Sequence, residues 1–121
     1  MALAHLLAED RYPPDALWHQ PLVSSRLLEC EVWNRINARR LQDSHGDAVR
    51  GLLDRIAIIE MVPPVLRRAL KPFPAPVRTL DAIHLAAIEF IRSQGASVQL
   101  ASYDERLAGV ARLLGIAEWN V

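Results

Sequence analysis

The chain has one cysteine, one lysine and no net charge. Because Cys30 is the only thiol, no disulfide can form within the chain, which favours a reducing compartment. Fourteen basic residues balance fourteen acidic ones, so any nucleic-acid contact must come from a local patch. No apolar run approaches the roughly 18 residues of a membrane span, and residues 1–11 lack a signal-peptide pattern. These absences predict a cytoplasmic protein with no membrane contact.

The 121 residues fit one domain, 1–121, that removes roughly two thirds of its unfolded surface from water. Helical spacing of apolar residues alternates with short β-branched runs. Strands are expected at 21–25, 56–62, 98–102 and 117–120, and the β-branched run 56–62 fits a buried strand. Helices are expected at 1–9, 15–19, 25–40, 43–55, 65–70, 79–93 and 103–114, with glycine stops at Gly95 and Gly115 after the last two. This alternation predicts an α/β fold, a parallel sheet with right-handed crossovers and helices on both faces.

Three carboxylates interrupt stretches that are otherwise apolar with helical spacing. Glu31 follows Leu27 and Leu28 at helical distance, and Asp81 and Asp104 precede apolar faces of their own helices. A buried carboxylate is costly unless it is paired, hydrogen-bonded or bound to a metal, and several together are harder still to ionise. The pattern therefore predicts an acidic pocket for a divalent cation.

Two of these acids are expected at helix N-termini, beyond the carboxyl ends of parallel strands, where functional residues gather. Ser102 and Glu105 have the S-x-x-E spacing of a capping box, which would place Asp104 in the first helical turn. Thr79 is a candidate N-cap, two residues before Asp81. Both acids are thus expected where exposed N–H groups favour negative charge.

Simpler interpretations stay open for each residue taken alone. Asp81 and Asp104 can serve only their helix dipoles, whereas no helix terminus accounts for Glu31. His84, one turn after Asp81, is better explained as a core histidine than as a ligand. Cys30 is expected to be a small core residue.

Arginine supplies thirteen of the fourteen basic side chains, and its planar fork suits phosphate. The arginines on or beside the helix of Glu31, and those before the helix of Asp81, are candidates for guiding RNA, with a solvated helix face an equally good explanation for each. They are Arg26, Arg35, Arg39, Arg40, Arg67, Arg68 and Arg78. Trp18 and Trp33 belong either to the core or to a groove for a partner helix.

The segments "SSRLLECEV", "VRTLDAIHLAAIEF" and "LASYDERLAGVARLLGI" resemble, in this order and spacing, the PIN-domain nucleases and most closely the VapC-type toxins of toxin–antitoxin pairs. The resemblance implies a PIN-like three-layer fold and a Mg²⁺- or Mn²⁺-dependent endoribonuclease whose metal site has four acidic positions. It implies that Glu31, Asp81 and Asp104 are three of these, with Ser102 as a supporting hydroxyl. It also implies an RNA substrate and a small antitoxin partner.

The N-terminus departs from the family pattern. Members normally open with a strand that ends in Asp, and here Met1 stands just after that position, so the first strand and its aspartate are expected to be missing. A missing central strand exposes sheet edges, which predicts a homodimer or capture by the antitoxin. A missing ligand predicts impaired cleavage, and the alternative function is an inactive PIN module that acts by binding a partner.

Overall fold

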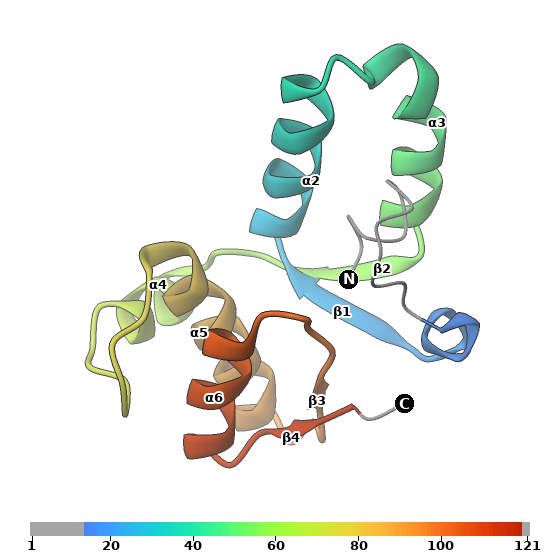
Figure 1. Cartoon of the computed structure of the whole chain (residues 1–121). Coiled ribbons are helices and arrows are strands. Elements are labelled where there is room, and N and C mark those ends of the chain that lie inside the picture. Colours follow the sequence, from blue (N-terminus) through green and yellow to red (C-terminus); the bar gives the residue numbers. More distant parts are fainter. Residues whose placement is uncertain (1–13, 120–121) are drawn as a thin grey trace. The chain divides into compact units, whose positions relative to one another are not determined.

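The computed structural model describes residues 14–119, and the chain divides into two compact units, Met1–Ile59 and Glu60–Val121 (Figure 1). The helix expected at 1–9 lies outside the described residues. The expectation that 1–121 forms one domain stays a prediction. Within the described residues, no helix is both long and apolar enough to cross a membrane.

The first unit joins two parallel strands through two helices. Its elements are a 3-10 helix η1 (Asp15–His19), strand β1 (Leu22–Ser25), helices α2 (Leu27–Ala38) and α3 (Gln42–Leu53), and strand β2 (Ile56–Ile59). The register of the strands runs from Leu22 opposite Ile56 to Ser25 opposite Ile59. The buried side chains of Val32, Ile36 and Val49 hold the two helices together, and Trp33 packs against them. Trp33 therefore belongs to this core, as one of its two interpretations expected.

The second unit also contains one pair of parallel strands, and these strands are shorter. It contains α4 (Pro63–Ala69), α5 (Thr79–Ser93), β3 (Gln99–Leu100), α6 (Glu105–Leu113) and β4 (Ala117–Glu118), with β3 and β4 paired in parallel. Its core cluster is formed by buried side chains of α5, α6 and the segment after α6: Leu85, Leu107, Val110, Ala111 and Ile116. Arg112 donates a side-chain hydrogen bond to Glu118, which raises the pKa of Arg112 and links α6 to β4.

Three helices end in the same hydrogen-bonded turn. After α2, α5 and α6, the residue in the left-handed region is Arg40 (φ 54°), Gly95 (φ 92°) and Gly115 (φ 77°). In each case the next N–H donates to a carbonyl five residues back, as in Leu41 to Ile36. This is the Schellman arrangement, in which the reversed φ lets the chain satisfy helix carbonyls. Glycine at two of the three positions explains why stops at 95 and 115 were readable from the sequence.

The parallel α/β class and most element positions are confirmed. Helix α5 has the expected bounds 79–93. The described strands form two two-stranded parallel sheets, one in each unit. The strands expected at 98–102 and 117–120 shorten to two residues each. Pro63 and Pro64 begin α4 rather than precede it, because proline fits the first turn, where its missing N–H is not needed.

Two burial expectations were wrong. Cys30 is exposed on α2. It lies two residues before the fully buried Val32, a step of about 200° around the helix, so it faces the opposite side. Strand β2 was expected to be buried, yet Ala57 is exposed and its neighbours are half-buried within the structure described.

Arg68 organises the connector between α4 and α5. Its Nε donates to Oε2 of Glu89 at 2.6 Å, with both side chains about three-quarters buried. Its guanidinium carbon lies 4.0 Å from the centroid of the Phe73 ring. Its Nη1 also donates to the carbonyls of Lys71 and Pro72, both at 3.4 Å. One side chain thus ties α4, α5 and the connector together.

Replacement of Arg68 by lysine should loosen this connector. Lysine keeps the charge but lacks the planar fork that reaches a carboxylate, a ring and two carbonyls at once. We expect a loss of about 1–2 kcal/mol in unfolding free energy and faster limited proteolysis at residues 71–77. Arg67→Lys, on the exposed side of the same helix, is the matched control. Equal protease resistance of the two variants would contradict this role.

Leu85→Ala should test the core of the second unit. Leu85 is fully buried among α6 side chains, so truncation should leave a cavity and cost about 2–5 kcal/mol in unfolding free energy. Leu80→Ala removes the same atoms from the same helix at a side chain that is 47% exposed. Urea denaturation of both variants measures the difference, and similar losses would show that the core lies elsewhere.

Candidate active site

Asp81 lies in the first turn of α5. The helix begins at Thr79, and the N-cap residue is Arg78, whose side chain makes no capping bond. The prediction that Thr79 is the N-cap was therefore wrong by one position, because Arg78 has the extended backbone (ψ 157°) of the entry residue. Asp81 is half-buried, and its negative charge is favoured beside the first N–H groups of the helix.

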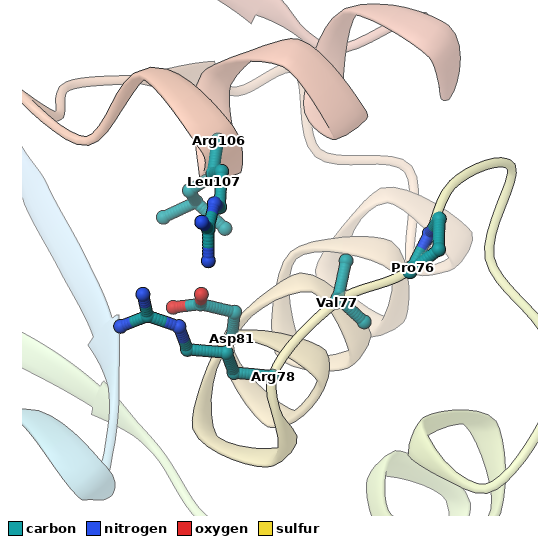
Figure 2. A pocket seen from close by; sticks show the side chains of 6 residues that line it. All are labelled: Pro76, Val77, Arg78, Asp81, Arg106 and Leu107. Carbon is teal, nitrogen blue, oxygen red and sulfur yellow. The ribbon is translucent and has the colours of Figure 1, made fainter.

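Asp81 lines a cavity of about 400 Å³. The wall is built from the end of the connector, the start of α5 and the start of α6: Pro76, Val77, Arg78, Asp81, Arg106 and Leu107. Figure 2 shows the guanidinium groups of Arg78 and Arg106 directed toward the Asp81 carboxylate, with Pro76 and Val77 farther along the connector. The cavity thus combines one carboxylate, two cations and an apolar wall.

Asp104 is the N-cap of α6. Its Oδ1 accepts hydrogen bonds from the backbone N–H of Arg106 at 2.9 Å and of Leu107 at 3.2 Å. The Ser102 hydroxyl in turn accepts the Asp104 N–H at 3.0 Å. The predicted capping box of Ser102 and Glu105 was therefore wrong. Asp104 has the extended backbone (φ −81°, ψ 107°) of the entry residue, so its side chain reaches the N2 and N3 amides.

These bonds connect Asp104 and Ser102 to the Asp81 cavity through the backbone. The two N–H groups that Asp104 holds belong to Arg106 and Leu107, which line the cavity. Ser102 fixes Asp104 in turn. The structure therefore places two of the predicted acids and the supporting hydroxyl around the start of one helix.

Glu31 lies in the other unit. It is half-buried on α2, and its direction toward the core stays a prediction. Ser25 precedes this helix, is buried, and accepts the Leu27 N–H at 3.3 Å, whereas the N-cap residue is Arg26. Because Glu31 belongs to the first unit and Asp81 and Asp104 to the second, a site shared by all three stays a prediction.

The donor chemistry of the second unit suits a hard cation. Between residues 14 and 119, no group of three or more His, Cys, Asp or Glu side chains is arranged so that it could hold a metal ion. Mg²⁺, however, commonly binds through one or two carboxylates and keeps several waters. The half-buried Asp81 carboxylate at a cavity, with Asp104 at the adjacent helix start, matches that mode in ligand type.

The sequence interpretation missed Arg106. A basic residue in the first turn of a helix opposes the helix dipole, which favours anions at that end. Arg78, considered only as one of several guiding arginines, has the same unfavourable position at the start of α5. Two arginines at two helix N-termini are a pattern that could have been read from the sequence.

Comparison with known proteins agrees with this architecture. The PIN domain family model matches residues 3–113. Ribonuclease VapC47 of Mycobacterium tuberculosis (strain CDC 1551 / Oshkosh) is 37% identical over 81 residues, 67% of this chain and 58% of the relative. Ribonuclease VapC35 of the same strain is 33% identical over 96 residues, 78% of this chain and 69% of the relative.

The chain therefore spans less than two thirds of the length of VapC47. No solved structure matches it. The family match covers most of the chain and includes Glu31, Asp81, Ser102 and Asp104, and both relatives carry the VapC name. The resemblance noted in the sequence is thereby confirmed, and the chain belongs to the PIN domain family, among its VapC-type members.

Proposed function

We propose that this chain is a metal-dependent endoribonuclease, the toxin of a toxin–antitoxin pair, that hydrolyses RNA phosphodiester bonds. The observation that carries the proposal is the half-buried Asp81 carboxylate at a cavity where the starts of α5 and α6 meet. The names of the VapC47 and VapC35 relatives, both ribonucleases, support the reaction type.

In this proposal Asp81, Asp104 and Glu31 hold a divalent cation, Mg²⁺ or Mn²⁺. Such an ion, when bound, supplies an activated water and neutralises charge on the scissile phosphate. The role of Ser102 is to hold the Asp104 backbone, which fixes the direction of that carboxylate. The N–H bonds that Asp104 accepts fix the first turn of α6, which carries Arg106 into the cavity.

The proposed partners are an RNA substrate, a small antitoxin protein and a second copy of the chain. A non-enzymatic module that only binds a partner is the second candidate function. It is favoured by an apolar groove of about 710 Å³ along α4, the connector and α5, where Leu70 is 86% exposed. Leu66, also exposed, lines the same groove, and neighbouring exposed apolar side chains are more typical of a binding surface than a single one. The first candidate function predicts RNA cleavage by this chain, and the second predicts none.

Asp81→Asn should remove metal-dependent activity without unfolding the chain. The change keeps the side-chain shape and deletes the charge that a cation requires. We expect at least about tenfold weaker Mn²⁺ binding by calorimetry and about 10²-fold slower cleavage of labelled RNA, with a loss of at most about 1 kcal/mol in unfolding free energy, because the charge of Asp81 is favoured at the start of α5.

Asp43→Asn is the matched control for Asp81→Asn, because Asp43 also lies in the first turn of a helix, α3, and is exposed. It should leave binding and cleavage unaltered. Unchanged Mn²⁺ affinity in Asp81→Asn would contradict the proposed ligand. Absence of cleavage by the unaltered chain, with normal Mn²⁺ binding, would favour the binding module.

The capping role of Asp104 and the role of its charge can be tested separately with two variants. Asparagine caps helices about as well as aspartate, so Asp104→Asn should keep α6 intact and still lose cleavage and Mn²⁺ affinity. Asp104→Ala should lose these and also about 1 kcal/mol of unfolding free energy. If Asp104→Asn cleaves RNA at the normal rate, Asp104 serves only as a helix cap.

A further inference from the structure

Arg78 and Arg106 occupy positions that helix stability alone does not explain. Each lies at the start of a helix, where positive charge opposes the dipole, and each is exposed at the mouth of the same cavity. Figure 2 shows both guanidinium groups converging from two different helices on one place beside Asp81. Such an arrangement gathers positive charge and N–H donors at a site already rich in exposed helix N–H groups.

Three other arginines of the second unit make hydrogen bonds or ion pairs within that unit. Arg68 binds Glu89, Arg92 donates to the carbonyl of Leu114, and Arg112 binds Glu118. In the part of the chain that the structure describes, the side chains of Arg78 and Arg106 have no such hydrogen bond or ion pair. Their donors are therefore available for a ligand.

We propose that Arg78 and Arg106 together bind one phosphate group of single-stranded RNA at the Asp81 cavity. This inference rests on the proposed ribonuclease function and names the residues that would position its substrate. Each guanidinium presents a planar fork of N–H donors, and that geometry matches two oxygens of a phosphate. Two forks from separate helices approach one phosphate from two directions.

The charge at the cavity fits a phosphodiester. Two arginines and one aspartate leave a single positive charge, and a phosphodiester group carries a single negative one. The apolar wall of Pro76, Val77 and Leu107 lowers the local dielectric, which strengthens charge-assisted hydrogen bonds there. Asp81 repels the same phosphate, so in the absence of a metal ion it should weaken RNA binding.

A purely structural role for the arginines predicts something different. If they only balance the charge of Asp81, their removal should change stability and metal affinity and leave RNA binding unaffected. The two roles are separated by how RNA affinity depends on salt. Each lost phosphate contact to a single strand should reduce the slope of log K against log salt by about 0.7.

The experiment uses the full chain with a chelator present and a short fluorescein-labelled single-stranded RNA, so that binding is measured without cleavage. Fluorescence anisotropy over a range of salt concentrations gives affinity and slope. We expect Arg78→Gln and Arg106→Gln each to weaken binding about tenfold at low salt and to lower the slope by about 0.7. Because the two side chains share one phosphate, the double variant should also lower the slope by about 0.7 in total, and not by twice that amount. Asp81→Asn should bind RNA more tightly than the unaltered chain.

Two controls keep the outcome unambiguous. Lys71→Gln removes one exposed positive charge from the connector, outside the cavity wall, and should keep the slope. Arg78→Lys and Arg106→Lys should restore most of the slope, since charge drives counterion release, while affinity stays below normal because the fork is lost. Thermal unfolding of every variant shows that folding is intact.

Unchanged slopes in both glutamine variants overturn the proposal. A slope in Lys71→Gln that is lowered as much as in the arginine variants also overturns it. A parallel cleavage assay with Mn²⁺ separates this inference from the proposed function. Cleavage by the unaltered chain with unchanged slopes refutes the phosphate site alone. Lowered slopes in a chain that never cleaves RNA refute the nuclease and leave the phosphate site standing.

Discussion

The packing of α5 with α6 in the second unit is the constraint on which the site depends. Leu85 of α5 is fully buried in one cluster with Leu107 and Ala111 of α6. Leu107 also lines the Asp81 cavity. The same residue therefore closes the core and forms the floor of the site, and the N-termini of two helices far apart in sequence meet at one place. Because interiors are close-packed, a small shift of either helix would displace these N-termini.

The helix starts at this cavity combine a stabilising charge with a destabilising one. Asp81 and the cap Asp104 are favoured by the exposed N–H groups of α5 and α6. Arg78 and Arg106 are not, and yet they lie beside these acids. Proteins often depart from the residue preferences of helix termini at functional sites, because the residue there is selected for binding and not for stability. The opposed charges at one cavity are therefore the observation on which the proposed site rests.

The connector between α4 and α5 shapes this face from one side. Arg68 holds it through Glu89, the Phe73 ring and two backbone carbonyls. The same connector then supplies Pro76 and Val77 to the cavity wall. A proline-rich segment has few conformations to lose on ordering, so one arginine suffices to fix it. Arg68 thereby influences the cavity without lining it.

The sequence by itself determined the parallel α/β class, the bounds of α5 and the helix stops at Gly95 and Gly115. Periodicity and glycine chemistry are local, so they can be read without tertiary contacts. The sequence also singled out Asp81 and Asp104, because a carboxylate among apolar side chains is costly to bury without a partner. It placed the cap of α6 incorrectly, since several residues before a helix can cap it and the backbone conformation at the helix entry decides which one does.

Only the tertiary structure brought Arg106 to Asp81, because Arg106 lies 25 residues later in the sequence and on another helix. Arg78, in contrast, lies three residues before Asp81 at the start of the same helix. The tertiary structure also decided that Cys30 is exposed, since helical periodicity gives a face but packing chooses which face is covered. Convergence of side chains is a long-range property that depends on how Leu85 and Leu107 pack. Residue type and spacing therefore selected the candidate acids, and the packing of α5 with α6 decided which groups share the cavity.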